Sequence, residues 1–231
     1  MTGLEQGLRL GLTELALALD ERQIGQLLNY LGLIQKWTRV YNLTAVREPS
    51  EMLTHHLLDS LAVIRPLRSQ LNGLEQGLAP QSDGAAKAEP AKFRLLDVGS
   101  GAGLPGVVIA ICCPELLVDC VDTVAKKAAF IQQVALTLRL PNLRGLHARV
   151  ENLTQKYQVV SSRAFASLAD FTSLSSVALA EQGIWLAMKG KHPADEIAAL
   201  PAQIDVFHVE QVVVPGLQAE RCIVWLRKVA A

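Results

Sequence analysis

The spacing of apolar residues differs between the first third of this chain and the rest. Over the first third, leucine and isoleucine recur every three or four positions, which is typical of one face of a helix. The first such stretch covers about Leu12–Val40, and Asp20 is placed to cap a helix inside it. A second stripe follows Pro49 and consists of Leu53, Leu57, Leu61 and Ile64. Residues 1–69 are therefore expected to form an N-terminal helical extension.

The composition changes between Gln70 and Lys92. Glycine and proline recur there among glutamine, serine and alanine, at Gly73, Gly77, Pro80, Gly84 and Pro90. Such a stretch favours a linker or a surface insertion. We expect residues 70–92 to connect the helical extension to a second domain that covers residues 93–231.

Short apolar runs of strand character alternate with helical patterns after residue 93. Five runs predict strands at 93–98, 116–121, 143–147, 157–161 and 183–188, with helices at 123–138 and 168–179. A helix at 194–200 then precedes two further strands, 204–214 and 222–229, which the turn Pro215-Gly216-Leu217 joins as an antiparallel pair. This order predicts an α/β fold with a doubly wound, mostly parallel seven-stranded sheet, whose ligand lies at the carboxyl ends of the strands.

The most informative stretch is Phe93–Val108, F-R-L-L-D-V-G-S-G-A-G-L-P-G-V-V. An apolar strand breaks into Gly99, Gly101 and Gly103, and Gly106 then opens a helical run. Glycine suits this turn because it adopts positive φ and because a Cβ would keep the backbone away from a ligand. A strand, a glycine turn and a helix form the unit that binds an adenine-bearing cofactor.

Two neighbours of these glycines favour S-adenosylmethionine over NAD. Gly101-x-Gly103-x-x-Gly106 also satisfies the dinucleotide pattern, so the glycines alone leave both cofactors open. Asp97 would repel a pyrophosphate but attract an ammonium and a sulfonium. Pro105 removes one of the free N–H groups that make a helix N-terminus a phosphate site.

The overall composition narrows the classes of partner and compartment. The 231 residues include 22 basic and 22 acidic ones, so a nucleic acid would have to bind a local basic patch. We find no signal peptide and no long uncharged apolar run, and Cys112, Cys113, Cys120 and Cys222 lack ligand spacing and lie in apolar stretches. We expect buried thiols, no metal, no membrane contact, a cytoplasmic location and a monomer.

Several polar residues follow the predicted strands at the ligand edge. Asp122 ends the second strand, 19 residues after Gly103, where an acidic residue accepts hydrogen bonds from ribose hydroxyls. Val150 and Glu151 follow the third strand and could close over an adenine. Arg163 follows the fourth and can bind a carboxylate, a phosphate or a base, and Lys189 follows the fifth and could meet an RNA phosphate. The competing interpretations are a loop carboxylate for Asp122 and a solvated surface residue for Lys189.

Five sequence blocks together resemble one known family. They are Y-N-L-T-A-V at 41–46, H-L-L-D-S-L at 56–61, L-D-V-G-S-G-A-G-L-P-G at 96–106, S-R-A-F at 162–165 and M-K-G at 188–190. In this order they resemble the bacterial 16S ribosomal RNA guanine-N7 methyltransferases of the RsmG type, also called glucose-inhibited division protein B. The resemblance implies a class I S-adenosylmethionine-dependent methyltransferase that modifies a guanine in the 530-loop region, with 16S rRNA or the small ribosomal subunit as its partner.

The resemblance also implies roles for single residues. Gly99 and Leu104 would bind S-adenosylmethionine within the glycine loop, Val150 and Glu151 would hold the adenine side, and Arg163 would line the pocket facing the guanine. Asp122 matches the acidic strand end of the family. The stretch 70–92 departs from the family, because it is longer and of lower complexity.

Guanine N7 carries a lone pair and no proton, so methyl transfer needs alignment rather than a general base. We therefore assign no catalytic acid or base and treat Arg163 as an orienting group. The base must be unstacked, because an A-form helix hides N7 in its deep groove. Arg39, Arg47 and His56 are the expected extra RNA surface, although a lone histidine beside an apolar stripe is more often structural.

Three other functions remain open on the sequence. A methyltransferase acting on a protein or a small molecule would share the cofactor site, and only the five blocks speak against it. A nucleotide-dependent oxidoreductase would bind NADH. A non-enzymatic RNA-binding or ribosome-assembly module would bind RNA regardless of the methyl donor.

Overall fold

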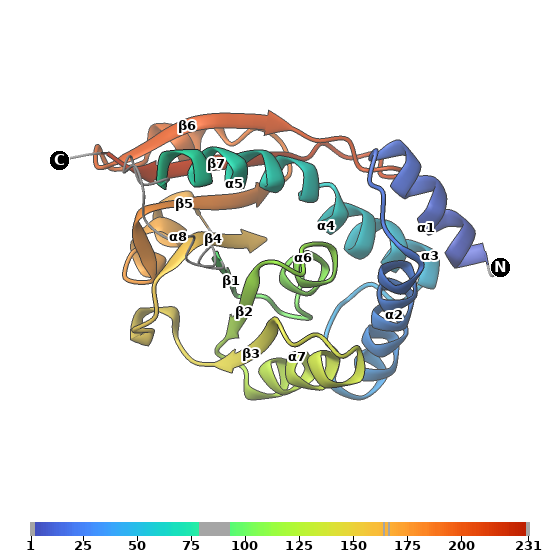
Figure 1. The fold of residues 1–231 in the computed structure, drawn as a ribbon. Coiled ribbons are helices and arrows are strands. Elements are labelled where there is room, and N and C mark those ends of the chain that lie inside the picture. The colour runs from blue at the N-terminus through green and yellow to red at the C-terminus, as the bar shows by residue number, and fades with distance from the viewer. Residues whose placement is uncertain (1–2, 79–92, 164, 166, 230–231) are drawn as a thin grey trace, which may run out of the picture.

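A seven-stranded sheet forms the centre of the molecule in the computed structural model, which describes residues 3–78, 93–163, 165 and 167–229 (Figure 1). The strand order is β3-β2-β1-β4-β5-β7-β6. The strands are β1 (Arg94–Val98), β2 (Leu117–Asp122), β3 (Leu143–His147), β4 (Tyr157–Arg163), β5 (Leu179–Lys189), β6 (Ile204–Gln211) and β7 (Cys222–Lys228). All seven predicted strands are confirmed, with ends that shift by a few residues.

The sheet is parallel from β3 to β5, and β7 pairs antiparallel with both β5 and β6. The chain leaves β1 toward β2 and β3 on one side and returns as β4 on the other. This change of direction between β1 and β4 opens a crevice at the carboxyl ends of the strands, where ligands of such sheets bind. The doubly wound, mostly parallel architecture is confirmed.

Helices cover both faces of the sheet. The C-terminal domain contributes α6 (Gly106–Cys112), α7 (Ala125–Thr137), α8 (Leu168–Ser175), α9 (Ala194–Ala198) and the 3₁₀ turn η2 (Val150–Asn152). The N-terminal part contributes α1 (Gly3–Glu14), α2 (Glu21–Tyr41), α3 (Pro49–Met52), the π-helix η1 (Leu53–Leu58), α4 (Asp59–Leu61) and α5 (Ile64–Leu78). Figure 1 shows α6 and α7 on the face where α2 and α4 also lie, and α8 near the opposite face.

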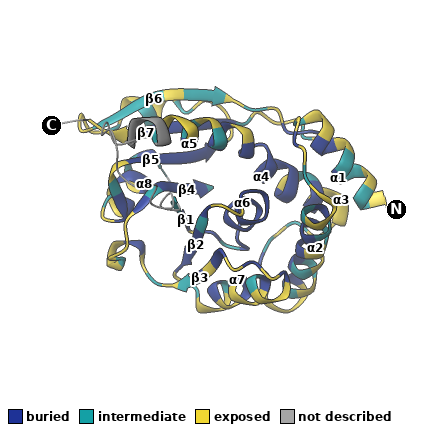
Figure 2. Cartoon of the chain, in the orientation of Figure 1, coloured by how far each residue is buried: buried dark blue, intermediate teal, exposed yellow. Residues whose placement is uncertain are grey.

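Alternate residues of the strands feed two separate apolar cores. Leu95 and Val159 belong to the core under α6, α7 and the N-terminal helices, whereas their neighbours Leu96 and Val160 belong to the core under α8. This alternation is the period-two pattern of a strand buried on both sides. The larger core also contains buried leucines of the N-terminal helices, so the extension and the sheet share one apolar interior (Figure 2).

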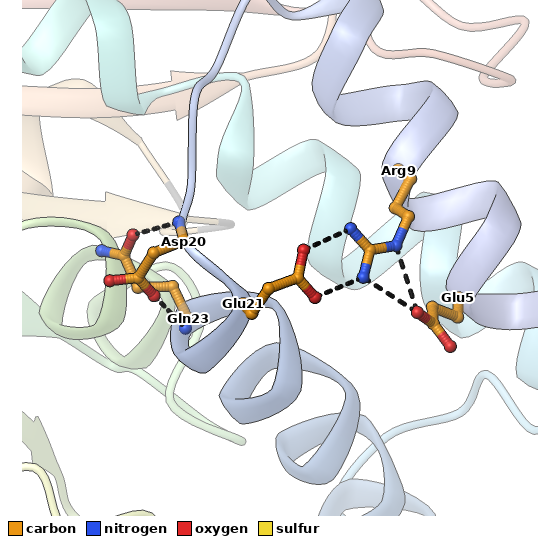
Figure 3. A network of polar contacts seen from close by, with 5 residues as sticks. All are labelled: Glu5, Arg9, Asp20, Glu21 and Gln23. Atoms are coloured by element: carbon orange, nitrogen blue, oxygen red, sulfur yellow. Dashed lines mark hydrogen bonds and ion pairs between the residues drawn. The ribbon is translucent and has the colours of Figure 1, made fainter. Parts of the chain in front are cut away.

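A polar network fixes how α1 meets α2. Asp20 caps α2, because its carboxylate accepts a hydrogen bond from Gln23 N at 2.7 Å and the Gln23 side chain accepts one from Asp20 N (Figure 3). Arg9 of α1 donates to both Glu5 and Glu21, at 2.9 and 2.6 Å. The expected cap at Asp20 is confirmed.

Two features of the N-terminal part differ from the sequence-based expectation. The stripe from Leu53 to Ile64 is buried as predicted, but it is interrupted by the π-helix η1, which a simple three-and-four pattern does not reveal. The expected linker does not begin at Gln70, because α5 continues as helix to Leu78. The remainder of that stretch, residues 79–92, lies outside the described residues.

All four cysteines are buried and free, as predicted. Burial raises the pKa of the Cys113 thiol from 9.0 to about 11, so this side chain is protonated at neutral pH and packs as an apolar group. Among the helices in the described ranges, none combines the length and the hydropathy that a bilayer crossing requires.

Candidate functional site

The glycine loop after β1 has the conformation that its sequence predicts. Gly99, Gly101 and Gly103 adopt positive φ of 65°, 59° and 88°. Gly99 is exposed, and a Cβ built on it would meet no protein atom within 4 Å. The loop therefore presents bare backbone to open space at the edge of the sheet. Gly106 is different. A Cβ built on it would lie 2.3 Å from the Cys120 Sγ atom, so close packing requires glycine at this position.

Asp97 supports this loop from inside the protein. Its side chain is fully buried, and its carboxylate accepts hydrogen bonds from Gly106 N at 3.0 Å and from Ser161 Oγ at 3.1 Å. Burial raises the pKa of the Asp97 carboxyl from 3.8 to about 7, and the two hydrogen bonds only partly oppose this shift. The carboxylate thus bonds to the start of α6 and to β4, and its attraction for a cationic ligand stays a prediction.

Asp122 at the end of β2 holds the opposite side of the loop. One carboxylate oxygen accepts a hydrogen bond from Gly101 N at 3.1 Å, and the other accepts one from Val124 N at 2.9 Å. Lys127 lies 3.5 Å from the same carboxylate. Asp122 thus lies close to the glycine loop, as its spacing predicts. Both of its oxygens already accept hydrogen bonds from the backbone, so a ribose hydroxyl would have to bond to their remaining lone pairs.

The N-terminal part also reaches the loop. Tyr30 of α2 is completely buried and donates a hydrogen bond to the Ala102 carbonyl at 2.6 Å. The Tyr30 oxygen also lies 3.3 Å from a Cβ position built on Gly103. The helical extension is therefore a direct support of the glycine loop, a contact that the sequence pattern did not indicate.

The other predicted cofactor residues occupy the same edge in different ways. Leu104 and Val150 are buried, at 4% and 6% exposure, so they offer mainly backbone and apolar surface. Glu151, in the 3₁₀ turn after β3, is exposed. The site thus brings together residues that follow β1, β2 and β3, as expected for one crevice.

Arg163 ends β4 at this edge and is held by the N-terminal part. Its Nη1 atom donates to Asp59 Oδ2 at 3.1 Å and to the His55 carbonyl at 2.9 Å. The other carboxylate oxygen of Asp59 accepts from Arg221 Nε at 2.8 Å. Sequence reasoning missed both Asp59 and Arg221. Only the shared helical face of His56 and Asp59 pointed toward the first.

The predicted RNA residues differ in accessibility. Arg47 is exposed and donates to Asn42 Oδ1 at 2.8 Å, and Arg39 is exposed as well. His56 is only 5% exposed and its Nε2 atom lies 2.8 Å from Thr44 Oγ1. Burial also lowers the pKa of His56. We therefore correct the expectation that His56 forms part of an exposed RNA surface, because its side chain is buried. Lys189 forms an ion pair with Glu196 at 2.7 Å, which an RNA phosphate would have to displace.

The donor set suits a bulky organic cofactor better than a metal ion. The loop offers open space and positive-φ glycines, together with a carboxylate and apolar surface nearby. These are the elements that bind an adenosine moiety with an amino-acid tail. Over the described ranges, no cluster of three or more His, Cys, Asp or Glu side chains could bind a metal ion.

Comparisons with known proteins agree with this geometry. The family model described as rRNA small subunit methyltransferase G (GidB) matches residues 23–73 and 84–224. Two relatives are named ribosomal RNA small subunit methyltransferase G. The one from Albidiferax ferrireducens is 71% identical and the one from Polaromonas naphthalenivorans 63%, and each alignment covers 100% of both chains.

Solved structures share the fold at low sequence identity. A SAM-dependent methyltransferase from Aquifex aeolicus aligns with a TM-score of 0.51 at 14% identity, over 79% of this chain and 99% of that one. TrmN from Thermus thermophilus also gives a TM-score of 0.51, at 19% identity, over 77% of this chain and 53% of that one. These two structures place the sheet in the class I methyltransferase architecture.

Proposed function

This chain belongs to the rRNA small subunit methyltransferase G family, and from that premise we propose that it methylates N7 of a guanine in 16S ribosomal RNA. S-adenosylmethionine is the methyl donor. The observation that carries the proposal is the convergence, at one edge of the sheet, of a bare glycine loop and the arginine that ends β4, Arg163. The position of the guanine within the 530-loop region, and a monomeric enzyme, are parts of the same proposal.

Backbone and buried groups of the first three strands would hold the cofactor. Gly99 and Gly101 would leave room for its amino-acid tail, and Gly103 would let the loop pack against α6 and Tyr30. Asp122 would bind the ribose, and Val150 and Glu151 would hold the adenine side. When bound, S-adenosylmethionine supplies a methyl group on a sulfonium centre. Asp97, Asp122 and Tyr30 keep the loop in shape by hydrogen bonds to its backbone or to the start of α6.

The acceptor side needs orientation rather than proton transfer. Guanine N7 has an in-plane lone pair and carries no proton, so no side chain has to act as a general base. Arg163 can donate hydrogen bonds to the guanine or to an adjacent phosphate and so hold N7 in line with the methyl carbon. The target base has to be unstacked before it can enter the crevice.

The test is transfer of labelled methyl from S-adenosylmethionine to small-subunit RNA, or to subunits, from cells that lack the modification. Mass spectrometry then identifies the methylated base. We expect a single N7-methylguanine with the wild-type protein. Gly99→Asp should abolish it, because the added side chain occupies the open space in front of the loop and brings a new charge.

A matched control separates loop strain from loss of the site. Gly216, between β6 and β7, also has positive φ, 74°, and a Cβ there would lie 3.7 Å from the nearest atom, in Thr54. Gly216→Asp should therefore carry a similar backbone cost and keep methyl transfer. Cofactor binding without methylation of any RNA would contradict the proposed acceptor and direct the search to a protein or small-molecule acceptor.

A further inference from the structure

One buried carboxylate holds two arginines that come from distant parts of the chain. The Asp59 side chain is 4% exposed, and each of its oxygens accepts a hydrogen bond from a different guanidinium, Arg163 at 3.1 Å and Arg221 at 2.8 Å. The two arginine side chains are 23% and 25% exposed. Each guanidinium is therefore anchored at one side and reaches solvent at the other.

The sheet register brings both arginines to the ligand edge. Arg163 pairs with Met188 between β4 and β5, and Met188 pairs with Ile223 between β5 and β7. Arg221 lies two residues before Ile223, and because β7 runs antiparallel, this position lies at the carboxyl ends of the parallel strands. Arg221 is thus on the same edge as Arg163 and the glycine loop.

The π-helix η1 supplies a second anchor for Arg163. In this segment the Asp59 N–H bonds to the carbonyls of His56 and Thr54, and the intervening His55 carbonyl accepts from Arg163 Nη1 at 2.9 Å. Both bonds from Arg163 to this segment use Nη1. Among the described residues, its other N–H groups have no hydrogen-bond partner, so they are available to a ligand. π-Bulges often occur at functional sites.

The three charges do not cancel. Two guanidinium groups on one carboxylate leave one net positive charge, in a partly desolvated place where a phosphate or the electron-rich edge of a guanine is attracted. A purely structural ion pair would need only one arginine. The same molecule contains such a pair, Arg227 with Asp205 at 2.9 Å on the outer strands, where both side chains are well exposed.

We propose that Asp59 is a positioning residue for RNA methylation, which holds Arg163 and Arg221 as an oriented pair and limits their combined charge to one. This inference rests on the proposed function. Asp59 does not touch the RNA; it acts through the arginines, whose free N–H groups fix the guanine-bearing segment in front of the methyl donor. Its loss should harm turnover more than RNA binding.

The test compares Asp59→Asn with the matched control Asp205→Asn, in the full-length protein with small-subunit RNA as the substrate. Asp59→Asn removes the negative charge and one of the two acceptor oxygens, which weakens the hold on both guanidinium groups. We therefore expect RNA affinity to be kept or raised and to fall more steeply with salt. We expect kcat to fall on the order of 10- to 100-fold, because the arginines lose their orientation. Asp205→Asn should leave kcat, RNA affinity and salt dependence as in the wild type.

A second pair of variants shows whether Asp59 acts through Arg163. In the Arg163→Gln background, Asp59→Asn should lower kcat by a smaller factor than it does in the wild type, because only the hold on Arg221 remains to be lost. Equal losses of RNA affinity and kcat in Asp59→Asn, or an unchanged kcat, would overturn the inference.

If Asp59→Asn does not fold, the Arg221→Gln variant is measured instead. A lowered kcat with intact cofactor affinity would support the arginine pair, and an unchanged kcat would refute it. Failure of the wild-type protein to methylate RNA would instead overturn the proposed function.

Discussion

The two sides of the crevice are held in different ways. On the cofactor side, two of the supporting hydrogen bonds join residues close in the sequence: Asp97 and Gly106 are 9 positions apart, and Gly101 and Asp122 are 21 apart. Tyr30 adds a bond to Ala102 across 72 positions. On the acceptor side, Asp59 bonds to Arg163 and Arg221 across 104 and 162 positions. The first side is therefore built mainly within the β1–α6–β2 segment, with one added contact from α2, whereas the second exists only after the N-terminal helices have docked.

This difference predicts which changes damage which step. A change inside the glycine unit should affect folding of the sheet or binding of the cofactor. A change in the contacts from the N-terminal part should leave the sheet folded and affect the loop or the arginines. Tyr30 is the link between the two sides, since it belongs to α2 and bonds to the Ala102 carbonyl of the glycine loop.

The largest effect is expected for Gly106→Val. Even the first added carbon would lie 2.3 Å from the Cys120 Sγ atom and 3.0 Å from Asp97, in a fully packed interior. We expect a loss of unfolding free energy on the order of 5 kcal/mol, measured by urea denaturation. Gly73→Ala is the control, because a Cβ there meets no atom within 4 Å. A variant as stable as the wild type would show that the packing at this junction is not tight.

The next effect is a pH dependence that Asp97 contributes. Its pKa is raised from 3.8 to about 7, so the folded state binds more protons than the unfolded state between these values. The contribution of Asp97 to stability is therefore full below about pH 4 and is lost as the pH rises to about 7. Its size is at most about 4 kcal/mol.

Asp97→Asn should remove this dependence, because an amide can accept from Gly106 N and donate to Ser161. We expect the stability of Asp97→Asn relative to the wild type to increase as the pH is raised from 4.5 to 8 in urea titrations. A constant difference across that range would contradict a protonated Asp97.

A smaller effect is expected for Tyr30→Phe, which tests the link between the two sides. The variant leaves the buried Ala102 carbonyl without its donor, at a cost of about 1–3 kcal/mol. Because the contact is with the glycine loop, we expect weaker binding of S-adenosylmethionine by calorimetry, several-fold in Kd. Tyr41→Phe, at an exposed tyrosine of the same helix, should bind as the wild type does. Equal affinity of both variants would exclude a role of α2 in shaping the loop.

The smallest effect is expected for Arg9→Gln. Arg9 connects α1 to α2 through Glu5 and Glu21, in a network that lies near the surface (Figure 3). Exposed ion pairs contribute little to stability, so we expect unchanged methyl transfer and a melting temperature close to that of the wild type. A large loss of activity would mean that the position of α1 matters for the site.

The sequence was sufficient for the parts of the molecule that local chemistry determines. The order of strands and helices after residue 93, the positive φ of Gly99, Gly101 and Gly103, and the place of Asp122 beside the loop all follow from patterns within a few tens of residues. The burial of the four cysteines follows from their apolar surroundings.

The remaining features depend on which distant segments meet. Asp97 was expected to attract a cationic ligand, but its buried carboxylate accepts hydrogen bonds from Gly106 N at the start of α6 and from Ser161 of β4, which its own segment does not reveal. His56 was expected at an RNA surface, but the π-helix buries it. The pairing of Asp59 with Arg221 could not be read from either segment alone, because it depends on the antiparallel return of β7.

The central claim is that the cofactor side and the acceptor side of this crevice are separate supports for one reaction. Its most direct test is calorimetric binding of S-adenosylmethionine to wild-type, Gly99→Asp and Asp59→Asn proteins, with single-turnover methylation of small-subunit RNA measured on the same samples. We predict that Gly99→Asp loses cofactor binding, and that Asp59→Asn binds the cofactor as the wild type does but transfers the methyl group slowly. Equal loss of cofactor affinity in both variants would contradict the claim.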